Sequence, residues 1–327
     1  MSRTIPGRRA LLRAGLAAPL ILPGLARAQG AWPARPVRVI VPFTPGGSND
    51  AVARPLAEHL SRRLGQPFVV ENRPGAGSTL GTAEVARSPA DGLTLLVTSS
   101  TFATSAATQR TPYDATGDLE GVALCATAPL LVLANREFPP NNLAELAAYL
   151  RANPGKVDYG SAGPGSINQL AAELFAQRAG GLKLVHIPYR GMGPATTDLV
   201  AGNIQLLFTT VPSAAGLVKE RSAKILGWTA ENRPEGLPAA PTPKESGIDY
   251  SAEIWWGLLA RRGTPPEILR RLNEVANEAL LEGRLASYLR SEGAAPAQQD
   301  ARAFDRFLRE DLARWRQVAE TAQIRID

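Results

Sequence analysis

Cysteine and histidine are almost absent from this chain of 327 residues. Cys125 is the single cysteine, so no disulfide can form within the chain. It lies in an apolar run over residues 122–133, where we expect a buried side chain rather than a reactive thiol. His59 and His186 are the two histidines, and neither has a partner at metal-ligand spacing. We therefore expect neither a metal site nor a bound cofactor.

Motifs for catalysis and for nucleotide binding are also missing. The chain contains no GxSxG, HExxH or SxxK pattern, and neither a GxxxxGK[ST] phosphate loop nor a GxGxxG loop. We expect no enzyme activity and no catalytic residue. One alternative remains open, an exported hydrolase whose Ser/His/Asp triad is assembled from distant segments around Ser161 or Ser166.

The first 28 residues predict an export signal. Arg8 and Arg9 begin a basic stretch, residues 14–25 are apolar, and Ala26-Arg27-Ala28 is a small-x-small cleavage site. The apolar stretch is shorter than the roughly 20 residues of a spanning helix. We expect cleavage near Ala28 and release into the periplasm. The paired arginines favour twin-arginine export, with Sec export as the alternative.

Neither sign of charge dominates once this segment is set aside. The chain has 36 Lys and Arg residues against 30 Asp and Glu residues. Residues 1–28 hold five arginines and no acidic residue, which leaves 31 basic and 30 acidic residues. A balanced chain gives no reason to expect nucleic acid or a membrane surface as a partner.

Strand-like and helix-like runs alternate, which predicts an α/β fold with parallel sheets. The predicted strands are 37–41, 68–71, 93–98, 130–134, 157–160, 184–187, 204–208, 224–228 and 254–260. The predicted helices are 50–64, 79–87, 142–152, 166–179, 193–201, 265–282, 283–291 and 301–322. Apolar strands followed by prolines indicate domain crossings near 130–137 and 224–228. We therefore expect residues 29–129 and 230–327 to form one domain, and 130–229 to form the other.

A strand, a glycine loop and a helix start follow one another over residues 39–50. Free N–H groups at a helix N-terminus favour an anion. Gly46 and Gly47 allow a ligand to approach the main chain. Without phosphate motifs, a carboxylate is the expected anion. An ordinary strand-to-helix turn, capped by Ser48 or Asn49, is the alternative interpretation.

Four further loops carry glycine, hydroxyl and amide residues after a predicted strand. They are 98–102, 160–168, 188–191 and 209–213. In open α/β sheets, ligands bind beyond the carboxyl ends of the strands, so these loops are candidates to line a cleft. Trp255 and Trp256 follow one another, either as a stacking platform at the cleft or with one ring in the core and one at a hinge surface.

The chain carries a series of ordered motifs at 32–37, 40–50, 70–77, 90–96, 153–156, 159–163, 186–191 and 263–266. Together they resemble the extracytoplasmic receptors of tripartite tricarboxylate transporters, also called the Bug family. The resemblance implies a two-domain α/β fold of the type II periplasmic-binding-protein (Venus-flytrap) kind, with a ligand cleft between the domains. It implies capture of a small carboxylate or dicarboxylate, without chemistry, for the permease subunits of a transporter. We expect a monomer. A ligand-sensing partner of a membrane signalling protein is the alternative role.

In this family, the loop with Pro45 and its glycines faces the 161–168 loop, and together they hold one carboxylate. The loops and the resemblance together predict ligand contacts at Phe43, Pro45, Gly46, Gly47, Ser48, Ser100, Thr101, Phe102, Ser161, Ala162, Gly163, Gly165, Ser166, Asn168, Tyr189, Thr209 and Thr210. Asn49 and Asp50 are expected to structure their own loop.

Three positions depart from the family pattern. The family often has His in place of Phe102, Ser or His near Asn168, and Asp-Asn in place of Thr209-Thr210. The changes remove a polar group and a negative charge from the expected site. Our hypothesis is a ligand with an apolar or aromatic body, or with a second carboxylate that no aspartate repels.

Overall fold

The computed structural model describes residues 32–321 except 232, 234–236, 238 and 292, together with Met1, Ser2 and Ile324. Apart from Met1 and Ser2, the predicted export signal lies outside these residues. The described helices and strands all belong to the unit formed by residues 33–327. Among them we find no helix with the length and apolar character needed to cross a membrane.

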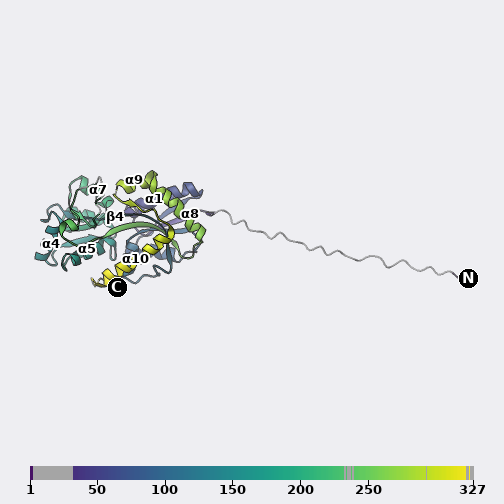
Figure 1. The fold of residues 1–327 in the computed structure, drawn as a ribbon, viewed down its shortest axis with the longest axis horizontal. Coiled ribbons are helices and arrows are strands. Elements are labelled where there is room, and N and C mark those ends of the chain that lie inside the picture. The colour runs from purple at the N-terminus through teal and green to yellow at the C-terminus, as the bar shows by residue number, and fades with distance from the viewer. Residues whose placement is uncertain are drawn as a thin grey trace. The chain divides into compact units, whose positions relative to one another are not determined.

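The first sheet has six strands in the order β11-β4-β10-β3-β1-β2 (Figure 1). Their bounds are β1 (Val37–Val41), β2 (Phe68–Asn72), β3 (Thr94–Ser99), β4 (Leu119–Pro129), β10 (Glu253–Arg261) and β11 (Ala295–Pro296). The second sheet has five strands in the order β7-β6-β8-β5-β9. These are β5 (Leu131–Asn135), β6 (Asp158–Ser161), β7 (Val185–Pro188), β8 (Leu206–Thr209) and β9 (Ala223–Trp228).

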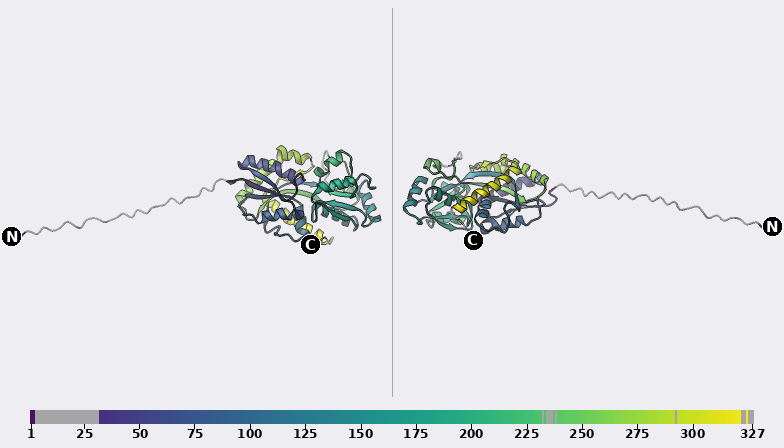
Figure 2. Two further views of the ribbon diagram at one scale, coloured as in Figure 1. Left: turned by 180° about the vertical axis from the view of Figure 1, so that it is seen from behind. Right: turned by 60° about the horizontal axis from the view of Figure 1, so that its bottom comes forward.

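Each sheet carries its own helices, and we call the two assemblies the first lobe and the second lobe (Figure 2). The first lobe has α1 (Ser48–Leu64), α2 (Thr79–Ala86), α3 (Thr101–Thr108), α8 (Pro266–Leu281), α9 (Gly283–Ser291) and α10 (Ala301–Thr321). The second lobe has α4 (Leu143–Ala152), α5 (Ile167–Arg178), α6 (Met192–Ala201) and α7 (Val211–Lys219). Two short 3₁₀ turns, η1 (Ala76–Ser78) and η2 (Lys244–Ser246), complete the described elements.

The expectation of purely parallel sheets is wrong, because both sheets are mixed. β1 is parallel to β2 and β3, but β10 is antiparallel to β3 and β4. Likewise β6 is parallel to β7 and β8, but β5 is antiparallel to β8 and β9. The antiparallel strands β5 and β10 each enter a sheet from the other lobe, so their direction is set by the crossing and not by a β-α-β connection.

Four elements were not predicted from the sequence. β4 was seen only as part of an apolar run, since most of its residues are buried on both faces and show no alternation. β11 has only two residues. α3 is rich in threonine, and α7 has a proline in its first turn, so both resembled loops. Each of these two short helices nevertheless begins beside the site described below.

The chain crosses between the lobes beside Leu130 and Thr229. The Leu130 amide donates to Thr229 Oγ1 at 2.7 Å, and the Thr229 amide donates to the Leu130 carbonyl at 3.0 Å. Thr229 Oγ1 also donates to the carbonyl of Ala252, directly before β10, at 2.6 Å. The three connecting segments are thus bonded to one another by fully buried groups, which gives the lobes a common pivot.

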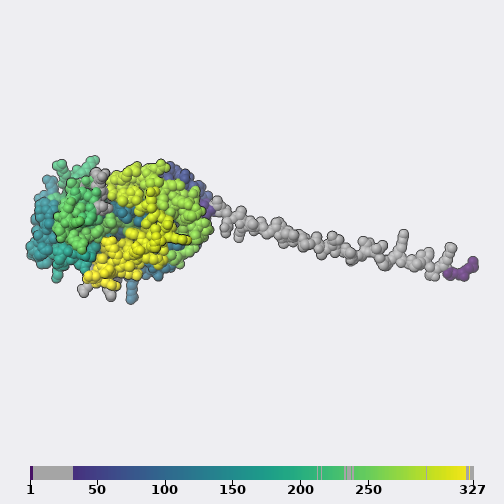
Figure 3. All heavy atoms as spheres, in the orientation of Figure 1, coloured from purple at the N-terminus to yellow at the C-terminus, as the bar shows by residue number. Residues whose placement is uncertain are grey.

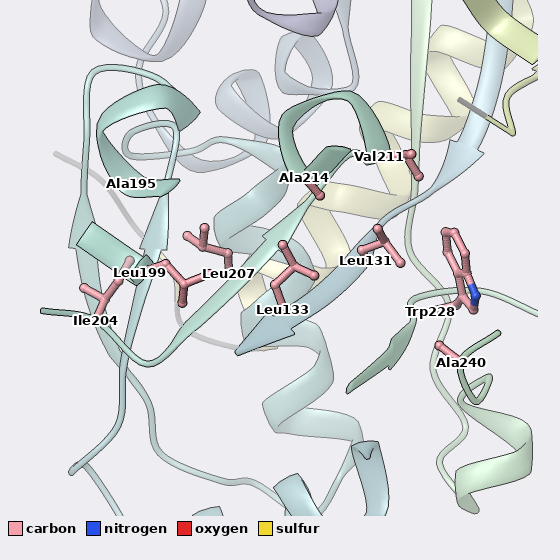
Figure 4. Close-up of a cluster of buried hydrophobic side chains, with 10 residues drawn as sticks. All are labelled: Leu131, Leu133, Ala195, Leu199, Ile204, Leu207, Val211, Ala214, Trp228 and Ala240. Carbon is pink, nitrogen blue, oxygen red and sulfur yellow. The ribbon is translucent and has the colours of Figure 1, made fainter. Parts of the chain in front are cut away.

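The second lobe has its own apolar core (Figure 4). Leu131 and Leu133 of β5 and Leu207 of β8 meet Ala195 and Leu199 of α6 in one buried cluster. Trp228 and Ala214 extend the same cluster. The members of this cluster all come from the second lobe and from the segment around Ala240.

The C-terminal helix α10 covers one side of the first lobe, and Figure 3 shows it in yellow beside α8. Its buried stripe, predicted from the spacing of apolar residues, includes Phe304, Leu308 and Trp315. Trp255 packs edge-on against Phe304 with ring centroids 5.7 Å apart. Trp255 and Trp256 are both buried. The pair therefore forms no stacking platform at the cleft, and neither ring lies at a hinge surface.

Asp311 on α10 is a buried carboxylate that accepts a hydrogen bond from Trp255 Nε1 at 2.8 Å. Burial raises its pKa to about 6, although the tryptophan bond acts in the opposite direction. The folded protein therefore holds this proton more tightly than the unfolded chain, whose aspartate pKa is about 3.9. The sign follows: stability from this group is highest below about pH 4 and falls as the pH rises through 6.

We expect Asp311→Asn to stabilise the protein at pH 8 by about 2 kcal/mol and to have little effect at pH 4. Asparagine keeps an oxygen for the Trp255 N–H but carries no buried charge. Urea unfolding of both proteins at the two pH values measures the difference. A variant that is less stable at pH 8, or equally changed at both pH values, would contradict the assignment.

Candidate functional site

A cavity of about 540 Å³ lies between the two lobes. Its lining residues from the first lobe are Pro42, Phe43, Thr44, Gly47, Ser48, Asn49, Pro74, Gly75, Ala76, Gly77, Ser78, Ser99, Thr101 and Ile254. Those from the second lobe are Ala162, Gly163, Pro164, Ile167, Asn168, Tyr189, Arg190, Gly191, Met192, Thr210 and Ser213. This volume is typical of a site for a small organic molecule.

Five helices begin at this cavity. Each of α1, α3, α5, α6 and α7 contributes at least one residue from its N-cap or first turn to the lining. The first N–H groups of a helix have no partner within the helix, and the helix dipole makes this end positive. The sum of five such ends is a positive potential across the cavity, supplied mainly by the backbone.

The loop before α1 is held by Asp50. The Asp50 carboxylate accepts from the Gly46 amide at 3.1 Å, from Arg54 Nε at 2.8 Å and from Asn72 Nδ2 at 3.0 Å. Burial alone would raise the pKa of Asp50, but the bonds from Arg54, Asn72 and Gly46 outweigh it and lower the pKa. Gly46 has φ +86°, a conformation that favours glycine. The Asp50 charge is thus compensated by its partners within the loop, so the N-terminus of α1 remains positive.

The opposing loop, between β6 and α5, is organised by Ser161. The Gly163 amide donates to Ser161 Oγ at 3.1 Å, and Ser161 Oγ lies 2.6 Å from His186 Nε2. Desolvation lowers the pKa of His186 to about 4, so the ring is neutral at physiological pH and shares a hydrogen bond with the serine hydroxyl. Such a histidine is a weak general base, and Ser161 is fully buried. This pair therefore fixes the loop.

The two lobes touch across the cavity. Thr104 Oγ1 on α3 donates to the Gly165 carbonyl at 2.6 Å, and Ser105 Oγ lies 3.4 Å from the same carbonyl. The 3₁₀ turn η1 lies so close to the β6–α5 loop that a Cβ on Gly77 would be 2.5 Å from the Pro164 carbonyl oxygen. These contacts describe a closed cleft.

The lining combines polar groups with apolar side chains. Phe43, Ile254 and Met192 contribute apolar surface. Asn49 Oδ1 and Ser78 Oγ are buried polar atoms without a hydrogen-bond partner in the described part of the chain. Since buried polar atoms are normally paired, these two suit a ligand or an ordered water.

The structure brings nine of the predicted contact residues to the cavity wall, namely Phe43, Gly47, Ser48, Thr101, Ala162, Gly163, Asn168, Tyr189 and Thr210. Asn49, expected only to structure its loop, also lines the cavity, whereas Asp50 does not. Eight other predicted contact residues are not among the described lining residues: Pro45, Gly46, Ser100, Phe102, Ser161, Gly165, Ser166 and Thr209. Several of the eight support the wall instead. Ser100 Oγ accepts from the Trp255 amide at 2.8 Å, and Ser166 caps α5.

Phe102 corrects one expectation. It lies on α3 with 1% of its surface exposed and stacks on Tyr113, with ring centroids 6.3 Å apart. A side chain at this position points away from the cavity because Thr101, one residue earlier on the helix, faces it. Thr209 is also fully buried, and of the Thr209-Thr210 pair only Thr210 reaches the cavity.

Sequence reasoning placed Arg190 and Gly191 in a candidate cleft loop without predicting contacts for them, and it missed Met192 and the segment from Pro74 to Ser78. Ala76 and Ser78 have positive φ values of 46° and 80°, which are uncommon for residues other than glycine. Such local strain often marks functional segments. The repeated glycines at 75 and 77 were the available signal, but only the fold places them at the cleft.

A larger surface hollow of about 640 Å³ is lined by residues of α5 and α10, among them Arg178, Arg314 and Thr321. Both helices contribute their C-terminal ends, where carbonyl groups make the dipole negative. The interlobe cavity differs from this hollow because helix N-termini, not C-termini, begin at it. In the described part of the chain, no group of three His, Cys, Asp or Glu residues could hold a metal ion.

Comparison with known sequences agrees with this geometry. Residues 52–324 match the family described as "Tripartite tricarboxylate transporter family receptor". The chain belongs to this receptor family. It is 35% identical to Protein BugT of Bordetella pertussis over 306 residues, covering 92% of this chain and 91% of that protein.

Solved structures agree as well. An R. palustris protein with adipate has a TM-score of 0.84 at 32% identity, covering 90% of this receptor and 99% of that chain. MatC from Rhodopseudomonas palustris with bound malate has a TM-score of 0.82 at 32% identity, with coverage of 88% and 99%. The receptor has the two-domain fold of periplasmic binding proteins.

Proposed function

We propose that this receptor captures a small carboxylate or dicarboxylate in the cavity between its lobes and delivers it to the permease subunits of a tripartite tricarboxylate-type transporter. The observation that carries the proposal is the convergence of five helix N-termini on one cavity with no acidic residue among its described lining. Fixed N–H groups in a partly dry site bind an anion without an opposing lysine or arginine.

The carboxylate lies between the starts of α1 and α5 in this proposal. Asn49 and Asn168 are buried at those starts, and Asn168 Nδ2 is held by the Phe208 carbonyl at 2.7 Å. The Asp50 bonds and the Ser161–His186 pair keep the two loops in position. Adipate and malate, which accompany the two related structures, are acids of this class.

We further propose an export signal cleaved near Ala28 and a monomeric receptor in the periplasm. Residues 29–129 with 230–327 would form one domain, and 130–229 the other. The buried hydrogen bonds between Leu130 and Thr229 support the boundary at 129/130. Ala240, by contrast, packs in the core of the second lobe, which favours a return crossing nearer to Ala252. Ligand release then requires the contacts of Thr104 and Ser105 with the Gly165 carbonyl of the opposite lobe to break.

The test is a thermal-shift and calorimetry panel on the mature chain, with dicarboxylates, monocarboxylates, aromatic acids, amino acids and sugars. We expect at least one carboxylate to raise the melting temperature by several degrees, because a ligand at 100 times its Kd stabilises by about 2.7 kcal/mol. Sugars serve as the uncharged control. Stabilisation by amino acids alone, or by no carboxylate, would overturn the proposal.

A further inference from the structure

Arg190 is the single charged residue among the described lining of the cavity. It is exposed, and its guanidinium forms no hydrogen bond or ion pair that involves another described residue. Arg54, near the same cleft, is by contrast bonded twice to Asp50, at 2.8 and 2.9 Å. Arg190 is thus a cation at the cavity wall whose charge is not paired with another described residue.

The backbone on both sides of Arg190 is held in place. The Tyr189 amide donates to the Ser161 carbonyl at 3.1 Å, and the Tyr189 hydroxyl donates to Asp198 Oδ2 at 2.6 Å. Gly191 follows with φ +117°, and a Cβ there would be 3.3 Å from Thr44 Oγ1 of the first lobe. Arg190 therefore stands at the seam of the closed lobes, next to a tyrosine that is anchored by two hydrogen bonds.

The depth of the lining residues separates two ends of the cavity. Asn49, Ile167 and Asn168, at the starts of α1 and α5, are buried. Arg190 is exposed, so it lies at the outer end. Apolar groups such as Ile254 and Met192 also line the wall. The cavity of about 540 Å³ is far larger than one carboxylate needs.

We propose that Arg190 selects dicarboxylates by pairing with a second carboxylate at the outer end of the ligand; this rests on the proposed binding of the first carboxylate at the α1 and α5 starts. A guanidinium matches the geometry of a carboxylate and donates two parallel hydrogen bonds to it. No acidic side chain of the described lining competes for the arginine or repels the second carboxylate. A monocarboxylate of equal length would leave Arg190 solvated and gain nothing from it.

Calorimetry with matched acid pairs tests this assignment. The pairs are succinate and butanoate, glutarate and pentanoate, adipate and hexanoate, and terephthalate and benzoate. We expect the wild type to bind the preferred dicarboxylate at least tenfold more tightly than its monocarboxylate. Arg190→Gln should lower the affinity for that dicarboxylate about tenfold and change the affinity for the monocarboxylate less than twofold. Arg190→Lys should retain part of the preference, since it keeps the charge but not the fork.

Arg62→Gln is the matched control. Arg62 is exposed in the last turn of α1, far along the helix from the cavity, and its substitution removes the same charge as Arg190→Gln. It should leave both affinities unchanged. If Arg190→Gln weakens both acids of a pair equally, Arg190 serves the shared carboxylate and the inference is wrong. Unchanged dicarboxylate affinity also overturns it, while carboxylate binding by the wild type would still support the proposed function. If the wild type binds no acid, the proposed function fails and the inference fails with it.

Discussion

Thr210→Asp is expected to weaken carboxylate binding about 100-fold while leaving the fold intact. Thr210 is the N-cap of α7, is buried, and lines the cavity with its Oγ1 3.1 Å from Ser213 Oγ. Aspartate is a favourable N-cap residue, so α7 should not lose stability. Its charge, however, enters a site whose described lining holds no other acid. Like charges a few ångströms apart repel by about 3 kcal/mol at an effective dielectric constant of 20.

Thr210→Asn is the matched control for this charge. Asparagine has the size of aspartate and caps a helix equally well, so affinity should stay within about threefold of the wild type. Calorimetry gives the affinities, and urea unfolding checks that both variants remain folded. Equal losses in the two variants would attribute the effect to shape. Normal binding by Thr210→Asp would place the carboxylate elsewhere.

Gly77→Ala should reduce ligand affinity about 30-fold by keeping the lobes apart. An added Cβ would lie 2.5 Å from the Pro164 carbonyl oxygen and 3.1 Å from Ser105 Oγ. The backbone of Pro164 cannot yield as the end of a flexible side chain does, and overpacking of this kind costs about 1–3 kcal/mol. Because the clash arises between lobes, opening the cleft relieves it, so the cost falls on ligand binding.

The matched control is Gly155→Ala, at the turn after α4. Gly155 has φ +66°, close to the +59° of Gly77, but an added Cβ there meets nothing within 4 Å. Both variants pay a similar backbone strain, and only Gly77→Ala should lose affinity. Small-angle scattering with saturating ligand should also give a larger radius of gyration for Gly77→Ala. Equal affinities in the two variants would show that this contact does not limit closure.

Several helices and loops could be predicted from the sequence alone because neighbouring residues determine them. In α1, Val52, Leu56 and Leu60 recur every four residues and are buried, and Gly65 ends the helix with φ +75°. The glycine loop before it was recognised because a strand and a helix start flank it. α10 was predicted from its apolar stripe, and its burial against β4 of its own lobe agrees with the interpretation as a core-covering helix.

Segments whose form depends on distant partners were not readable in this way. β4 is buried by β10 and α10, so its sequence lacks the alternation of a half-exposed strand. α3 begins at Thr101 with threonine and alanine instead of an amphipathic pattern. The direction of β5 and β10 follows from the crossing between lobes, which composition does not record.

The sequence by itself determined that a strand–glycine–helix loop offers backbone N–H groups to an anion, since that property arises within about ten adjacent residues. It also determined that Asp50 stands in the first turn of that helix. The tertiary structure alone decided which side chains face the cavity: Thr101 does and Phe102 does not, because a helix turns by about 100° per residue. It also decided that Arg190 and the segment from Pro74 to Ser78, distant in sequence, line the same cavity, because only the packing of one lobe against the other brings them together.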